Sequence, residues 1–122
     1  GGTSKSPWDG LATVYEYDPQ TNTWKRKSDI NLGRWALSTC VINDMIFCMG
    51  GSVSGLSSGA TRVEIYSPAE DKNYTSTGML NKAYAQGSCV YNQKIYVFGG
   101  CISPYPYEYN TNKAAVGVPV WE

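Results

Sequence analysis

The sequence predicts an all-β fold made of repeated four-stranded antiparallel units, and three observations support this prediction. A Gly-Gly pair occurs at residues 1–2, 50–51 and 99–100, at two successive spacings of 49 residues. A shift of the sequence by 49 residues aligns further identical residues, which indicates one supersecondary unit used repeatedly. The 122 residues also include ten Tyr, four Trp, thirteen Gly and six Pro, a composition typical of short strands and many turns. The aligned identities are Val14/Val63, Tyr17/Tyr66, Pro19/Pro68, Ala36/Ala85, Cys40/Cys89, Val41/Val90, Asn43/Asn92 and Ile46/Ile95.

Residues 1–29 are expected to supply half of a unit. The glycine pair at 1–2 matches the end of a unit's second strand, and the segments 13–19 and 22–28 have the composition of its third and fourth strands. Because the chain then begins inside a unit, two origins remain open for the missing strands. They belong to the same longer polypeptide, or identical chains associate to cover the open end.

Residues 30–78 are expected to form one complete unit with strands at 35–42, 45–49, 62–66 and 73–77. The dipeptide Asn43-Asp44 between the first two strands is a two-residue hairpin signal. The second strand ends in Gly50-Gly51, where glycine permits a positive φ or a close backbone approach, and a loop rich in Gly and Ser follows.

Residues 79–122 are expected to form a second full or nearly full unit, which gives about two and a half units in all. Its first strand begins at Tyr84, its second ends in Gly99-Gly100, and its third is expected at 105–110. Because adjacent strands are antiparallel, the turns at 43–44 and 92–93 are expected at one end of the molecule. The loops after the glycine pairs and the links between units then share the other end.

Four-stranded units with a period near 50 residues are typical of β-propeller blades. The sequence resembles the kelch repeat in particular, in which a strand ends in Gly-Gly, a Tyr and then a Trp follow, and an Arg precedes the next blade. The resemblance implies a partial kelch propeller, in which the large rings fill the wedge between neighbouring blades. The positions that match are Gly50, Gly51, Gly99, Gly100, Tyr17, Tyr66, Trp24 and Arg34, whereas Tyr74 and Ala83 stand where a Trp and an Arg are expected.

The kelch resemblance implies a protein-interaction module that binds a peptide or protein at the loop end, as a substrate adaptor or scaffold does. Arg34 is the first candidate contact, since its guanidinium can bind a carboxylate through two hydrogen bonds, and a structural ion pair or carbonyl contact is the alternative role. The further candidates are Ser52, Trp35, Tyr84 and Tyr105.

No catalytic constellation is evident, and we expect no enzyme activity, cofactor or metal site. The sequence contains no His and shows no C-x-x-C spacing among Cys40, Cys48, Cys89 and Cys101. The alternative is part of a kelch-like propeller enzyme or a carbohydrate-binding protein whose site other blades complete, and exposed aromatic residues such as Trp8 favour the latter.

The charge balance and the cysteines limit which partners and which cell compartment are expected. Ten basic and ten acidic residues cancel, so neither nucleic acid nor an anionic membrane is an expected partner. Cys40 and Cys89 share a repeat position and are expected as small buried hydrophobic residues rather than a disulfide, which favours a cytoplasmic setting. The sequence Asn73-Tyr74-Thr75 matches a glycosylation motif, which such a setting would leave unused.

Overall fold

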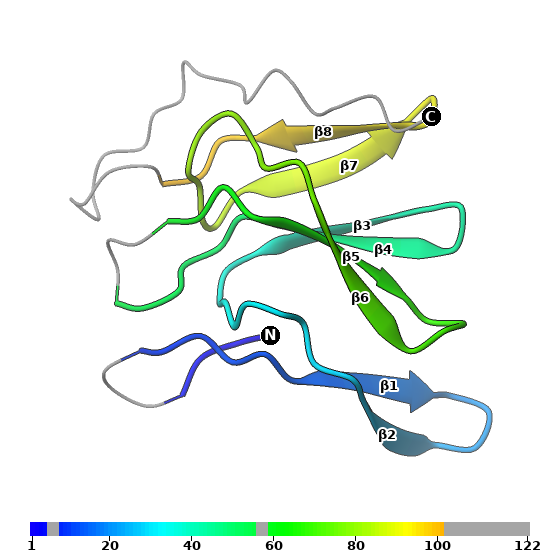
Figure 1. Cartoon of the computed structure of the whole chain (residues 1–122). Coiled ribbons are helices and arrows are strands. Elements are labelled where there is room, and N and C mark those ends of the chain that lie inside the picture. The colour runs from blue at the N-terminus through cyan, green and yellow to red at the C-terminus, as the bar shows by residue number, and fades with distance from the viewer. Residues whose placement is uncertain (5–7, 56–58, 102–122) are drawn as a thin grey trace.

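A computed structural model describes residues 1–4, 8–55 and 59–101, which form eight short strands in three antiparallel sheets (Figure 1). The first and third sheets are two-stranded hairpins, and the second has four strands in the order β3-β4-β5-β6. None of the described residues belongs to a helix long and apolar enough to cross a membrane. The strands are β1 (Val14–Asp18), β2 (Thr23–Lys27), β3 (Ser38–Ile42), β4 (Met45–Met49), β5 (Val63–Ser67), β6 (Lys72–Ser76), β7 (Gly87–Tyr91) and β8 (Lys94–Phe98).

The described strands are distributed along the chain as follows. The hairpin β1-β2 lies in 1–29, the sheet β3 to β6 lies in 30–78, and β7-β8 lies in 79–122. The strand expected at 105–110 falls outside the described residues.

The hairpin turns adopt the backbone conformation that their sequences predict. Asn43 and Asp44 have φ values of 49° and 61°, and Asn92 and Gln93 have 48° and 60°. Two successive positive φ angles define a type I′ turn, whose twist matches that of the flanking strands. The turn pairs Ile42 with Met45 and thereby sets the register of the whole β3-β4 ladder.

The glycine pairs at the ends of β4 and β8 also adopt positive φ. The values are 61° and 94° for Gly50 and Gly51, and 64° and 91° for Gly99 and Gly100. At Gly50 a side chain would also meet its neighbours, because a Cβ atom would lie 2.4 Å from Nε2 of Gln86. These are backbone conformations that glycine adopts without the steric cost that a side chain would bring.

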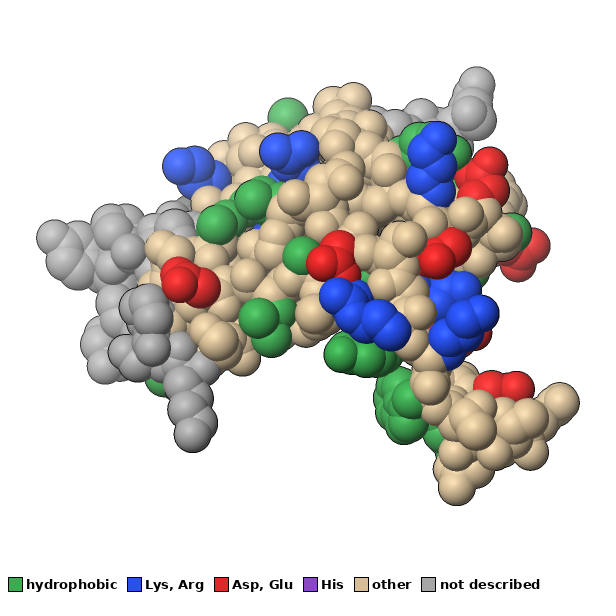
Figure 2. All heavy atoms as spheres, turned by 60° about the horizontal axis from the view of Figure 1, so that its bottom comes forward, with side chains coloured by type: hydrophobic (Ala, Val, Ile, Leu, Met, Phe, Trp, Pro, Cys, Tyr) green, Lys and Arg blue, Asp and Glu red, His purple; other side chains and the backbone are tan. Residues whose placement is uncertain are grey.

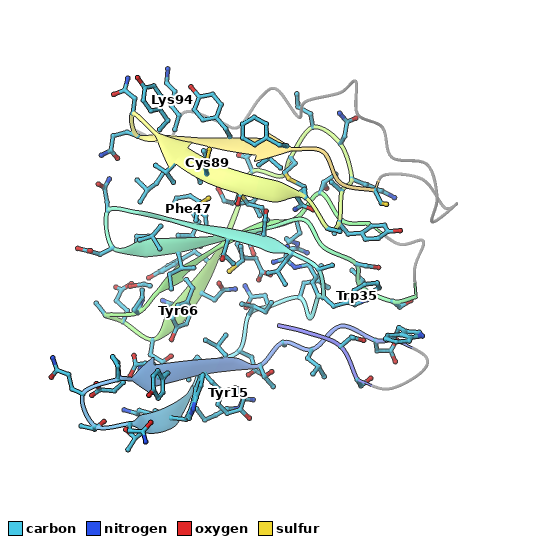
Figure 3. All side chains as sticks on the ribbon, turned by 180° about the vertical axis from the view of Figure 1, so that it is seen from behind. Tyr15, Trp35, Phe47, Tyr66, Cys89 and Lys94 are labelled. Atoms are coloured by element: carbon cyan, nitrogen blue, oxygen red, sulfur yellow. The ribbon has the colours of Figure 1, made fainter. Side chains whose placement is uncertain are left out.

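The core lies between the four-stranded sheet and the hairpin β7-β8. Alternating residues of the strands point into it, as expected for sheets with one buried face. Its buried members are Cys40, Ile42, Phe47, Met49, Val63, Met79, Ala83, Ile95 and Val97. Figure 3 shows Phe47 between the outer hairpins, and this core joins consecutive blades.

The cysteines are all free, as predicted, but only three of the four are buried. Cys40 is a core residue, whereas Cys89, at the same repeat position, is exposed. The prediction of burial was wrong for Cys89, because none of the described residues covers its side of β7.

The repeat aromatics differ in their surroundings. Tyr66 is buried, and its hydroxyl donates a hydrogen bond of 2.6 Å to Oδ1 of Asp71. Tyr17 and Trp24 stack on each other with ring centroids 4.9 Å apart, yet Trp24 is 69% exposed. Of the three, only Tyr66 is buried, and no described strand covers the open side of β1-β2.

Turns and loops occupy opposite ends of the molecule (Figure 1). The four hairpin turns project together at the right of the view, while the links between blades and the loops that follow the glycine pairs gather at the left. This arrangement is the one that strand alternation predicts. We call the second end the loop face and define it by the described residues 3–4, 8–10, 31–35, 52–55, 59–60 and 78–84.

Candidate functional site

Short isolated bridges hold the backbone of the loop face. Trp35 and Ser52 exchange two backbone hydrogen bonds of 3.0 and 2.8 Å, and Tyr84 and Cys101 repeat the same pair of bonds 49 residues later, at 3.1 and 2.9 Å. Ala60 is bridged to Ala83, which ties one blade's loop to the next blade's link. These bonds fix the start of each blade relative to its neighbour.

Three aromatic side chains from successive repeats follow one another across the loop face, and we call them the aromatic row. The ring centroids of Trp8 and Trp35 lie 6.4 Å apart, and those of Trp35 and Tyr84 lie 5.9 Å apart. Both distances are within the range of favourable ring contacts. Figure 3 shows Trp35 at the end of the molecule opposite to Tyr66 and Lys94.

Exposure falls along the aromatic row. Trp8 is 50% exposed, Trp35 is partly buried, and Tyr84 is buried. The indole nitrogen of Trp35 is buried and has no hydrogen-bond partner among the described residues. Trp8 and the outer part of Trp35 are therefore the members that a ligand can reach.

Arg34 lies inside the protein and is 0% exposed. Its guanidinium and Nε donate to the carbonyl oxygens of Leu32, Gly50 and Arg62 at 3.2, 2.7 and 2.9 Å. Nη2 donates to Oε2 of Glu64 at 2.6 Å, in an ion pair whose two side chains are both fully buried. Arg34 thus joins the link before β3 to the end of β4 and to β5.

Glu64 completes this buried cluster. Besides Arg34, its carboxylate accepts hydrogen bonds from the backbone N–H of Asn31 at 2.7 Å and from Nδ2 of Asn73 at 2.6 Å. Burial lowers the pKa of the Arg34 guanidinium, and the negative charge of Glu64 acts in the opposite direction. The charges are balanced inside the blade, as buried charges require.

The structure supports the alternative, structural role for Arg34 and removes three predicted contacts from the accessible surface. Arg34 and Ser52 are 0% exposed, and Tyr84 is buried against Trp35. A partner cannot touch these side chains in this conformation, because the link and loop backbones cover them. Trp35 stays a candidate, and Tyr105 lies outside the described residues.

Glu64 was absent from the candidates drawn from sequence, although the sequence contained a signal for it. An acidic residue between Val63 and Ile65 stands in an apolar strand, and such a residue needs a buried cation or several donors. Asn73 is a member of the same cluster. Its Nδ2, the atom that N-glycosylation would modify, donates a hydrogen bond to Oε1 of Glu64. This bond makes modification of the folded chain unfavourable.

The distribution of charge also separates the two ends. Figure 2 shows acidic and basic side chains intermixed at the right of the view, where the hairpin turns lie, and fewer of them toward the loop face at the left. Among the exposed charged residues, Arg26 and Asp29 form an ion pair.

Comparisons with known proteins were made on sequence and on structure, and no protein-family model matches the chain. It is 33% identical over 91 residues to kelch-like protein 15 of Danio rerio, an alignment that covers 74% of the chain and 15% of that protein. It is 31% identical over 91 residues to an F-box/kelch-repeat protein of Arabidopsis thaliana, covering 73% of the chain and 23% of that protein. The chain thus spans less than a quarter of the length of these relatives.

A solved structure entitled "Structure of YjhT" superposes with a TM-score of 0.65 at 22% identity, covering 75% of this chain and 30% of that one. Together with the sheets and turns described above, this similarity defines the class of the protein as a β-propeller, of which the described blades form a part. The sequence matches narrow the class further. The chain belongs to the kelch-repeat family.

Proposed function

We propose that the chain is a protein-interaction module that binds a peptide or protein segment at the loop face, as part of an adaptor or scaffold rather than an enzyme. The observation that carries this proposal is the aromatic row, in which an exposed Trp8 continues into Trp35 and Tyr84. Rigid aromatic side chains give a large contact area at a low entropic cost, and Trp and Tyr are enriched among the residues that dominate binding energy.

The position of the row on a bonded backbone supports the proposal further. The reciprocal bonds of Trp35 with Ser52 and of Tyr84 with Cys101 hold two members in place before a partner arrives. A pre-organised surface loses less conformational entropy on binding. Recognition by Trp8 and Trp35 replaces the predicted contact with Arg34, whose side chain is occupied inside the blade.

The residue inventory agrees with a binding role and with a reducing compartment. The sequence has no His, so the commonest general base is not available from this segment. The four cysteines are free, and we therefore propose a cytoplasmic setting, where thiols are kept reduced.

A phage-displayed library of short random peptides, selected on the immobilised protein, tests the proposal. The enriched peptides are then titrated by fluorescence anisotropy against wild type, Trp8→Ala and Trp24→Ala. Trp24 is the matched control, because it is more exposed than Trp8 but lies in β2, away from the loop face.

We expect Trp8→Ala to weaken binding about tenfold or more, the usual effect of removing a central aromatic anchor, and Trp24→Ala to leave it within about twofold. Failure to enrich any peptide would refute the proposal. Equal weakening by both substitutions would also refute it, since binding would then not occur at the aromatic row.

A further inference from the structure

A second feature of the loop face is a pocket of about 380 Å³, whose lining combines the apolar residues Leu32 and Ala60 with polar and basic ones. It lies where the start of β5, the end of β6 and the links between blades meet. The lining includes two cations, three hydroxyl groups and a glycine, from residues Thr61, Arg62, Thr75, Ser76, Gly78 and Lys82. No acidic side chain is among its lining residues.

The two cations of the pocket are not neutralised. Neither Arg62 nor Lys82 forms an ion pair with any described residue, and the one side-chain hydrogen bond of Arg62, from Nη1 to Oγ1 of Thr75, is long at 3.4 Å. Arg34 is also close, since it bonds the carbonyl of Arg62, but its charge is matched by Glu64. Counting Arg34, Arg62 and Lys82 against Glu64 leaves a local excess of two positive charges.

A hydroxyl group in the pocket also has no partner. Oγ of Ser76 is buried and makes no hydrogen bond within the described part of the chain. A buried hydroxyl without a partner costs free energy, and each such group in a native structure requires an explanation. Rotation of the Ser76 side chain toward the pocket would let this hydroxyl donate to the oxygen of a bound ligand.

We propose that this pocket binds a phosphate monoester, and that its natural source is a phosphorylated side chain of the protein partner. A phosphate group has three acceptor oxygens and close to two negative charges at neutral pH. It can therefore use the planar guanidinium of Arg62, the ammonium of Lys82 and the hydroxyl of Ser76 together. A carboxylate has only two oxygens and one charge, and matches this set less completely.

The pocket is placed to act with the aromatic row. A Cβ atom at Gly59 would lie 3.5 Å from both Cβ of Lys82 and Cδ1 of Tyr84, so the pocket and the row border the same backbone segment. The pocket and the aromatic row therefore belong to the same face, and we place the phosphorylated residue of the bound partner in the pocket. The partner's identity rests on the proposed function, whereas phosphate binding by the pocket does not.

The first test titrates inorganic phosphate into the protein at constant ionic strength, with sodium chloride as the matched salt, and follows backbone amide NMR shifts. We expect saturable shifts at residues 61–62, 75–78 and 82 in phosphate alone. Arg62→Gln should weaken binding about tenfold, the effect of losing one charge-assisted hydrogen bond. Lys94→Gln is the control, because Lys94 begins β8 at the turn end of the molecule (Figure 3).

The variant Ser76→Ala distinguishes an effect on phosphate binding from an effect on the stability of the fold. It removes the unpartnered hydroxyl, so we expect weaker phosphate binding with no loss of thermal stability in the free protein. Absence of saturable shifts in wild type, or equal weakening by Arg62→Gln and Lys94→Gln, would overturn the proposal.

The second test compares a peptide selected on the loop face with the same peptide carrying phosphoserine at each position in turn. At least one position should bind about tenfold tighter, and Arg62→Gln should abolish that gain. If inorganic phosphate binds but no phosphopeptide gains affinity, the pocket binds free phosphate. The claim that the phosphate belongs to a side chain of the protein partner is then wrong. If the unmodified peptide binds but phosphate does not, the proposed function stands and this inference fails.

Discussion

The buried ion pair between Arg34 and Glu64 makes a specific prediction about stability. Arg34→Met keeps a side chain of similar length but removes four hydrogen bonds and leaves the Glu64 carboxylate without its cation. Removing one partner of a buried pair costs about 3–5 kcal/mol, which is a large part of the 5–15 kcal/mol that stabilises a typical domain. We expect the midpoint of urea unfolding, followed by Trp fluorescence, to fall by about 2 M.

The matched control is Arg26→Met, which breaks the ion pair with Asp29. That pair is about half exposed, at 46% and 47%, so solvent replaces the lost interaction and the cost is smaller. The double variant Arg34→Met with Glu64→Leu should cost less than the sum of the two single changes, because it leaves no isolated charge inside the blade. Equal costs for Arg34→Met and Arg26→Met would refute the reasoning.

Two further predictions concern the links between blades and the glycine pairs. The pKa of the Asp71 carboxyl is lowered in the folded chain, first by the hydrogen bond from the Tyr66 hydroxyl and then by that from the backbone N–H of Ser28. The ionised carboxylate therefore stabilises the fold at pH values above its ordinary pKa of about 4, and this stabilisation is lost as the pH falls through the lowered pKa. Asp71→Asn should therefore lower the free energy of unfolding near neutral pH, and the difference in that free energy from wild type should shrink toward about pH 3. A difference that does not change with pH would contradict the role given to the Asp71 carboxylate. Gly50→Ala and Gly99→Ala impose a similar positive φ, at 61° and 64°. Among the described residues, only the Cβ at position 50 meets other atoms within 4 Å, including the backbone oxygen of Ala83 at 2.6 Å. Gly99→Ala should cost about 1–2 kcal/mol and Gly50→Ala clearly more in thermal unfolding, whereas equal costs would mean that backbone conformation alone selects glycine there.

The backbone of the loop face is repeated from one blade to the next. Arg34 and Ala83 occupy the same repeat position but have different side chains. Two residues later, Ala36 and Ala85 both adopt positive φ, at 51° and 56°. The backbone is therefore repeated closely even where the side chains differ. What distinguishes one blade from the next is the side chains it presents, such as Arg62 and Lys82 in the pocket and Trp8 in the row.

The sequence predicted the local elements well because each depends on neighbouring residues. The Asn43-Asp44 turn, the positive φ of Gly50 and the pairing of strands on either side follow from backbone sterics and from alternation over a few residues. The repeat at 49 residues then placed turns and loops at opposite ends without any knowledge of the packing.

Burial could not be predicted in this way, because it depends on what lies across the fold. Nothing in the sequence near Arg34 shows that Glu64, thirty positions later, and the carbonyl of Gly50 enclose it; only the tertiary structure decides that this Arg is structural. The same holds for Cys40 and Cys89, which share a repeat position yet differ in exposure because one side is covered by the next blade. The sequence by itself determined the blades and the end at which their loops meet, since these follow from short-range geometry. The packing of distant segments decided which side chains remain exposed there.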